Sequence, residues 1–260
     1  SNKGKVTRPK KGAADEEVTL KGTVKMGDYA KARNFTFVVL AESEMGPTKE
    51  FALDQVELLD DYYLTAQNSD IEFLKKFDND RLLSRFRETA GLDTKKIAPY
   101  GGWEDGWLGG HSVGHYLTAI AQAVKATGNA DLKEKSKQLI EGLAECQNKL
   151  GTGFIFGAKI ETEGYVEKQF DILEGKTTGK TWVPWYNMHK MLTGLVDTYK
   201  YTGNKQALEV AKKLGDWIYN RVSKWDAGTQ GRVLGTEYGG MNDCLYELYL
   251  CTRDSKHLEA

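Results

Sequence analysis

Apolar residues recur with helical spacing through most of the chain from about Val56 onward. In residues 111–126 they fall on one helix face: Val113, Leu117, Ile120, Ala121 and Val124. This spacing is typical of an amphipathic helix that packs on a core. Similar patterns predict helices over 132–150, 189–201, 207–222 and 242–250, and from 258 onward. The sequence therefore predicts a mainly α-helical protein.

The predicted helices form a repeated helical hairpin. Residues 127–129 and 202–204 read Thr-Gly-Asn, and residues 252–254 read Thr-Arg-Asp. Gly favours the left-handed end of a helix, and Asn or Asp caps the helix that follows. The long loops between hairpins differ in length, which fits a helical toroid better than a solenoid of fixed period. We expect these loops to converge at the end opposite the tight turns.

The N-terminal residues have a different pattern. Residues 1–14 are rich in Lys and Gly, and we expect them to be disordered. Residues 18–24 and 35–40 are β-branched and alternating, which predicts two strands. Two strands bury no core alone, so 15–42 is interpreted as a remnant of a β-sandwich module or a hairpin laid against the main domain. Residues 43–55 form a predicted linker, and 56–260 the helical domain.

Composition narrows the classes of partner. The chain has 36 basic and 37 acidic residues and a formal net charge of -1. No basic stripe is interleaved with aromatic residues, which argues against nucleic-acid binding, and no apolar run is long enough to cross a membrane. The three cysteines form no disulfide pattern. Cys244 and Cys251 lie two helical turns apart, about 10.5 Å, and cannot share one zinc ion.

Three segments rich in glycine and aromatic residues each precede or open a predicted helix. They are residues 100–115, 182–190 and 237–243. Aromatic rings stack on the apolar faces of ligands, and histidine donates hydrogen bonds or exchanges protons near neutral pH. Converging at one end of the ring, these segments predict a substrate-binding site. Its candidate residues are Trp103, Glu104, His111, His115, Trp185, Tyr186, His189, Glu237 and Asn242.

Several of these residues also have simpler interpretations. His111 and His115 have zinc-ligand spacing, but no Glu stands where a metalloprotease helix has its base, so no metal ligand is assigned. They would instead contact a polar substrate or be buried and hydrogen-bonded. Trp103 and Glu104 could be a packing ring and a solvated carboxylate.

Carboxylates near the third glycine-rich segment also have two interpretations. Glu237 and Asp243 flank Gly239-Gly240, and paired carboxylates suit acid/base work on a glycosidic bond. Alternatively, Asn242 or Asp243 simply caps the helix.

The ordered motifs at 56–59, 80–92, 100–104, 110–117, 182–190 and 237–243 resemble the β-L-arabinofuranosidase families, glycoside hydrolase families 127 and 146. The resemblance covers Val56 to Ala260, and residues 15–42 resemble the end of a bacterial immunoglobulin-like module. It implies a partial (α/α)6 barrel, the N-terminal half of the catalytic domain. It also implies a secreted or periplasmic bacterial enzyme that hydrolyses terminal L-arabinofuranosyl groups of plant glycans with retention.

The resemblance further implies a cysteine nucleophile held by zinc beside a glutamate, with a separate glutamate as acid/base. In the family these groups follow the last motif matched, so they are expected beyond Ala260, and Glu237 is the one catalytic candidate within the chain. We therefore expect an inactive fragment that holds no zinc. Among the matched residues, His189 is the best supported contact to a terminal arabinose.

Three other interpretations stay open. A non-catalytic carbohydrate-binding toroid would keep the aromatic segments without the cysteine chemistry. A helical-repeat scaffold for protein partners would not need Trp103, Trp185 and His189 to cluster. Another (α/α)6 hydrolase or lyase would place Glu104 and Glu237 within about 5–9.5 Å of each other.

Overall fold

The computed structural model describes residues 7–42, 50–104, 106–158 and 165–260. The chain divides into two compact units, Ser1–Phe51 and Ala52–Ala260. Parts of the predicted disordered segment 1–14 and of the predicted linker 43–55 lie outside the described residues.

The first unit is an antiparallel hairpin of β1 (Glu16–Met26) and β2 (Tyr29–Val39). Its two-residue turn has Gly27 at a φ of 59°, the left-handed conformation that tight hairpin turns require. The strands are longer than the predicted 18–24 and 35–40, because the main chain pairs through flanking polar residues as well. Val24 and Phe37 are 74% and 52% exposed, so the hairpin has no core of its own.

The second unit is helical, and it begins with a single 3-10 turn at Leu53–Gln55. Two more 3-10 turns, Gly102–Glu104 and Gly106–Leu108, precede the longest helices. The helices are α1 (Asp61–Lys75), α2 (Asn79–Ala90), α3 (His111–Thr127), α4 (Ala130–Leu150), α5 (Lys168–Leu173), α6 (Pro184–Thr202), α7 (Lys205–Val222), α8 (Ala227–Leu234), α9 (Met241–Thr252) and α10 (Lys256–Glu259). Helix boundaries agree with the predicted ranges to within a few residues, except that α6 begins at Pro184 rather than His189.

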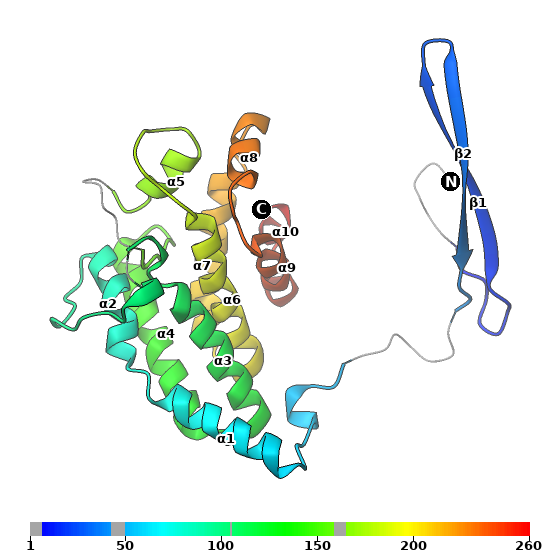
Figure 1. The fold of residues 1–260 in the computed structure, drawn as a ribbon. Coiled ribbons are helices and arrows are strands. Elements are labelled where there is room, and N and C mark those ends of the chain that lie inside the picture. The colour runs from blue at the N-terminus through cyan, green and yellow to red at the C-terminus, as the bar shows by residue number, and fades with distance from the viewer. Residues whose placement is uncertain (1–6, 43–49, 105, 159–164) are drawn as a thin grey trace. The chain divides into compact units, whose positions relative to one another are not determined.

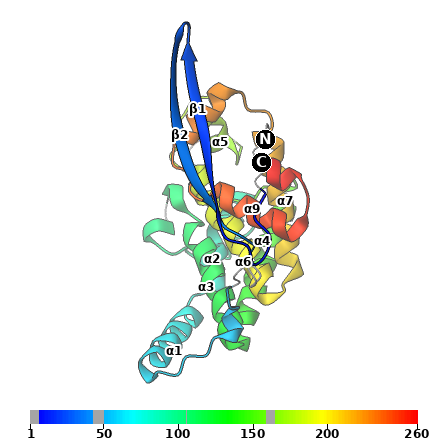
Figure 2. The same cartoon turned by 90° about the vertical axis from the view of Figure 1, so that its right-hand side faces the viewer.

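The helices pack in two rows, which confirms the predicted hairpin repeat. In one row α6 packs between α3 and α9, and in the other α7 packs between α4 and α10. Figures 1 and 2 show α3 and α6 side by side. Each of the hairpins α3–α4, α6–α7 and α9–α10 thus contributes one helix to each row. The α1–α2 pair, which packs on α3 and α4, extends the arrangement by one hairpin that the repeat did not predict.

The tight turns have the predicted chemistry. Gly128 and Gly203 end α3 and α6 with φ angles of 69° and 73°. Asn129 and Asn204 then cap α4 and α7, each accepting a hydrogen bond from a backbone N–H of the next helix. The third turn keeps this geometry without glycine, since Arg253 is left-handed at a φ of 59°.

Two glycines let α3 and α6 pack with their backbones in contact. A Cβ at Gly114 would lie 2.2 Å from the Lys190 carbonyl oxygen, and a Cβ at Gly194 would lie 2.5 Å from the Gly114 carbonyl oxygen. Real side chains do not approach so closely, so only glycine fits at either position. Around the crossing lie fully buried side chains such as Leu117 and Leu195. In the part of the chain that is described, we find no helix both long and apolar enough to cross a bilayer.

We predict that Gly114→Ala destabilises the protein by about 1–3 kcal/mol, because the methyl group forces the two helices apart. Gly231→Ala is the matched control, since a Cβ there meets no atom within 4 Å and the residue lies inside α8. The control should be neutral or stabilising by up to about 1 kcal/mol. Urea unfolding followed by circular dichroism measures both; equal effects of the two variants would contradict the close crossing.

Candidate functional site

Helix α3 begins at a glycine, and its N-terminus is capped by a distant carboxylate. Gly110 adopts a φ of 90° and has no side chain with which to cap the helix. Glu104 instead accepts hydrogen bonds from the backbone N–H groups of Gly110 (2.7 Å) and Ser112. A carboxylate at this position satisfies free N–H groups and complements the helix dipole.

This role contradicts the expectation that Glu104 binds substrate hydroxyls. Its side chain is buried, at 5% exposure, and both oxygens accept from the helix. It is neither the solvated carboxylate of the simpler interpretation nor a free member of a carboxylate pair with Glu237. Instead Glu104 holds in place the turn of helix from which His111 projects.

Trp103, His111 and His115 lie together at this end of α3. The rings of His111 and His115 are 4.7 Å apart, as residues one turn apart on one face should be, and the Trp103 ring lies 5.4 Å from His111. Trp103 is 62% exposed and His115 is also exposed, whereas His111 is buried. Trp103 therefore offers a solvent-facing ring beside two imidazoles.

Helix α6 adds two more rings to the same group. Tyr186 stacks on His111 with centroids 5.5 Å apart and planes 19° from parallel, and His189 meets Tyr186 edge-on at 5.2 Å. The Lys190 ammonium lies 4.9 Å from the centre of the Tyr186 ring. We call Trp103, His111, His115, Tyr186 and His189 the histidine–aromatic cluster.

The third glycine-rich segment packs against this cluster. A Cβ at Gly239 would lie 2.2 Å from the His189 ring, so the backbone there can approach only because the residue is glycine. The three segments thus meet at the end of the helical unit where the long loops lie, as their places in the repeat predict.

Glu237 and Asn242 flank this contact. Glu237 is exposed and accepts a hydrogen bond from the Gly239 N–H (2.8 Å), while Asn242 is exposed in the first turn of α9. Helix α9 begins after Gly240 and has no side-chain cap, so the structure does not use Asn242 or Asp243 for capping. Glu237 thus lies two residues from the glycine that contacts His189, whereas Asn242 lines a pocket with Trp185 and Tyr238, outside the cluster.

Trp185, by contrast, lies in the core. It is 2% exposed and packs on the rings of Phe170, Trp217 and Trp225, with centroids 5.0, 6.1 and 5.4 Å away. The expected substrate contact of Trp185 is therefore corrected to a packing role. The reason is the early start of α6: neighbouring helical residues point about 100° apart, so Tyr186 reaches the cluster while Trp185 turns inward.

Burial and nearby positive charge keep the cluster histidines neutral. Burial lowers the pKa of His111 to about 4, with smaller contributions from His115 and Lys190. Burial also lowers the pKa of His189 to about 4, with Lys190 the next cause, and the same two causes lower the pKa of His115. At neutral pH each ring therefore offers one N–H donor and one acceptor nitrogen.

Some of these ring nitrogens have no hydrogen-bond partner among the described residues. They are both nitrogens of His111 and Nδ1 of His189. Buried polar atoms are rarely left unpaired, because their desolvation costs free energy. Unpaired donors and acceptors beside an exposed tryptophan suit a ligand that carries several hydroxyl groups.

Asn187 links two of the segments that form the cluster, a role that the sequence did not indicate. Its side-chain amide donates a hydrogen bond to the Gly109 carbonyl (2.8 Å), and the residue is 1% exposed. This bond ties α6 to the loop that opens α3. The sequence shows only an amide residue between Tyr186 and His189; its burial and its partner become visible in the structure.

The three cysteines do not fit the zinc-bound nucleophile of the resembled families. Burial raises the pKa of Cys146 and of Cys244 to about 12, and also raises the pKa of Cys251. Zinc ligands and sulfur nucleophiles are thiolates. Among the described residues, no cysteine belongs to a group of side chains able to share a metal ion. We therefore assign no catalytic step to these cysteines.

In comparisons with known proteins, two family models match different parts of the chain. The model of the GH127 β-L-arabinofuranosidase catalytic domain matches residues 55–260, and the model of an atrophied bacterial Ig domain matches residues 1–42. No curated protein matches the chain. Among solved structures, a GH127 β-L-arabinofuranosidase from Geobacillus stearothermophilus T6 is similar at 16% identity and a TM-score of 0.46. That match covers 80% of this chain and 29% of the solved chain, so the present chain spans less than a third of its relative.

We predict that Lys190→Met raises the pKa of His111 and His189 above about 4, because it removes a nearby positive charge. Lys190→Arg keeps the charge and should leave both pKa values unchanged. Histidine NMR signals followed from pH 3 to 8 measure this. Unshifted values in Lys190→Met would contradict the electrostatic assignment. Since both folded pKa values lie below the unfolded value of about 6.5, the stability contributed by the neutral rings should fall as pH drops from about 6.5 toward 4.

Proposed function

The chain belongs to the GH127 β-L-arabinofuranosidase catalytic-domain family, and we propose on that basis that it forms the sugar-binding wall of a glycoside hydrolase. The enzyme would hydrolyse terminal β-L-arabinofuranosyl groups of plant glycans with retention of configuration. A bacterial enzyme acting on such a polymer would work in a secreted or periplasmic location. The observation that carries the proposal is the histidine–aromatic cluster, where three glycine-rich segments meet.

The chemistry of the cluster suits a small sugar. The exposed ring of Trp103 can stack on the apolar face of a furanose, while Tyr186 and His111 form a second stacked pair behind it. Neutral His111 and His189 have unpaired nitrogens that can donate to or accept from ring hydroxyls. Charged groups would not be needed to bind such a neutral ligand.

The glycine contacts give the proposed site a fixed shape. Gly114 and Gly194 set the distance between α3 and α6, and Gly239 seats the third segment on His189. Because these are backbone contacts in a packed interior, the rings are held before a ligand arrives. Preorganisation of this kind reduces the entropy lost on binding.

Within this proposal the chain binds the sugar and does not supply the nucleophile. The thiols of Cys146 and Cys244 are buried and that of Cys251 is half-buried, and burial raises the pKa of all three, which supports assigning the nucleophile to none of them. Glu237 is exposed next to the cluster and stays the one candidate for acid/base work. Zinc, where present in the whole enzyme, would keep a sulfur nucleophile deprotonated. A carbohydrate-binding toroid without catalysis is the alternative that the same cluster supports.

We predict that Trp103→Ala weakens binding of methyl β-L-arabinofuranoside to the chain about fivefold, because a stacked ring contributes roughly 1 kcal/mol. Trp182→Ala is the matched control: Trp182 is also an exposed tryptophan, at 55%, but it makes no ring contact with the cluster. Isothermal titration calorimetry measures both affinities. If the two variants bind equally, Trp103 is not the stacking platform.

His189→Ala should also weaken binding of the same glycoside, by a loss of hydrogen bonds rather than stacking. His189→Gln can restore one donor and one acceptor, so partial recovery of affinity is expected. Calorimetry of both variants, with circular dichroism to check folding, tests this. Wild-type affinity in His189→Ala would remove His189 from the proposed site.

A further inference from the structure

A second group of side chains, outside the histidine–aromatic cluster, is centred on His257. This residue lies in the first turn of α10 and is 1% exposed. Its ring packs on the backbone of α7 at Gly215, where a Cβ would lie 2.8 Å from the ring. The glycine therefore lets a buried imidazole lie directly against the neighbouring helix.

One ring nitrogen of His257 is fixed by a hydrogen bond. Nδ1 lies 2.8 Å from the Thr252 hydroxyl oxygen, and the Thr252 hydroxyl donates to the Leu248 carbonyl at 3.0 Å. A hydroxyl has one proton to donate, so Thr252 must accept from the Nδ1–H of His257. Burial also lowers the pKa of His257, which favours the neutral ring. The lone pair of the neutral ring is then on Nε2.

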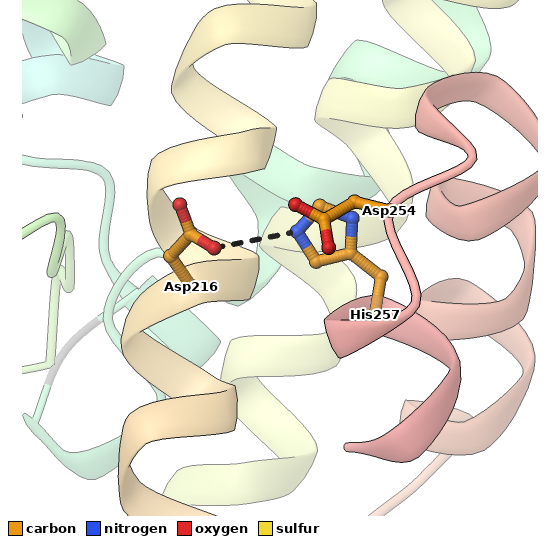
Figure 3. Close-up of side chains that lie close together, drawn as sticks. All are labelled: Asp216, Asp254 and His257. Carbon is orange, nitrogen blue, oxygen red and sulfur yellow. Dashed lines mark ion pairs between the residues drawn. The ribbon is translucent and has the colours of Figure 1, made fainter.

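That lone pair faces two carboxylates. Nε2 lies 3.9 Å from Asp216 Oδ1 on α7, and Asp254 reaches the same place from the turn between α9 and α10 (Figure 3). The ligand atoms of these three residues lie within 4.8 Å of one another. Among the described residues Nε2 has no hydrogen-bond partner. A lone pair and two carboxylates around one point repel each other unless a cation lies between them.

Two other groups lie close to this point. The Lys256 ammonium is 2.7 Å from Asp216 Oδ1 and 3.6 Å from Asp254 Oδ2. The negative charges of Asp254 and Asp216, and to a smaller extent the Lys212 backbone, raise the pKa of His257 against the lowering by burial. Lys256 offsets the charge of the carboxylates, but its ammonium group donates to Asp216, and Nε2 is left without a partner among the described residues. Its side chain is 44% exposed, so it can move into solvent and leave the carboxylates to another cation.

We propose that Asp216, Asp254 and His257 form a binding site for a divalent transition-metal ion such as Zn²⁺. One imidazole nitrogen and two carboxylate oxygens are a donor set that zinc accepts, with water completing the coordination. Metal-bound histidines almost always donate their other N–H to an oxygen, as His257 does to Thr252. Bonds of about 2.0–2.2 Å place two ligand atoms at most about 4.4 Å apart, so the partly exposed Asp216 and Asp254 must turn slightly inward.

Metal binding at this place would join α7 to the turn between α9 and α10. Asp216 lies on α7, while Asp254 and His257 lie on either side of the point where α10 begins. The ion would fix the turn after α9 against the middle of α7. This inference does not rest on the proposed sugar binding, because it uses none of the residues of the cluster.

The test is a titration of ZnCl₂ into the EDTA-treated chain, followed by calorimetry and by thermal unfolding. Wild-type protein should bind one ion with a rise in Tm. Asp216→Asn and His257→Gln should each weaken binding by more than about tenfold. Asp70→Asn, which removes an exposed carboxylate on α1, should have no effect. Lys256→Gln should bind zinc more tightly than wild type, since the competing ammonium is gone.

The outcomes separate this site from other zinc ligands of the chain. Binding lost in His115→Gln but kept in His257→Gln would place the ion at the His111–His115 pair and overturn the proposal. No binding to wild type, or unchanged binding in both Asp216→Asn and His257→Gln, would also overturn it. If His257→Gln fails to fold, the Lys256→Gln variant provides the test, because the Lys256 side chain is half exposed and its replacement should not disturb folding. Weaker zinc binding by Lys256→Gln than by the wild type would contradict the proposed site.

Discussion

The backbone contact between α3 and α6 is the constraint on which the rest of this structure depends. Gly114 lies against Lys190 and Gly194, so the two helices are closer than any larger residue would permit. On α3 the contact falls next to His115 and about one turn from His111, and on α6 it falls next to His189. The close packing of the two helices therefore also determines how closely the rings of the site pack. A side chain at either glycine would separate both together.

The same crossing explains the electrostatics of the site. Rings brought together by the helices exclude water from one another, which lowers the pKa of His111 and His189, and Lys190 adds to the effect. Unpaired nitrogens in such a place cost stability, because their hydration is lost without replacement. A hydroxyl-rich ligand would supply the missing partners. The free energy of folding that these unpaired nitrogens cost would be recovered when a ligand forms hydrogen bonds with them.

Local patterns in the sequence were enough to predict the helical hairpins and where their open ends meet. Helical spacing and the Asn129 and Asn204 caps depend on residues a few positions apart, which a sequence displays directly. The left-handed Arg253 was harder to predict, since the structure imposes on a non-glycine residue the turn that glycine makes elsewhere. Helical spacing was present in residues 80–87, but the α1–α2 pair was not recognised as a hairpin of the repeat because it lacks the Thr-Gly-Asn turn of the other hairpins.

Roles set by distant partners could not be read from the sequence. Glu104 looked like a sugar ligand, yet it caps a helix that begins seven residues later. The missing capping side chain at Gly110 was the only sign. Trp185 and Tyr186 are adjacent in an aromatic segment, and only the starting point of α6 decides which one faces the core. Arg221 holds α5 in place through ion pairs with Glu167, Asp171 and Glu174. These partners lie about fifty residues away in the sequence, and no sequence motif indicates the contact.

The central claim is that three segments distant in sequence form one sugar-binding surface. NMR spectra of the chain titrated with methyl β-L-arabinofuranoside test it most directly, through the tryptophan indole and histidine ring signals. We predict that the signals of Trp103, His115 and His189 shift together along one saturable curve, while those of the core residue Trp217 and of His257 stay unchanged. Shifts confined to one segment, or shared equally by Trp217 and His257, would contradict it.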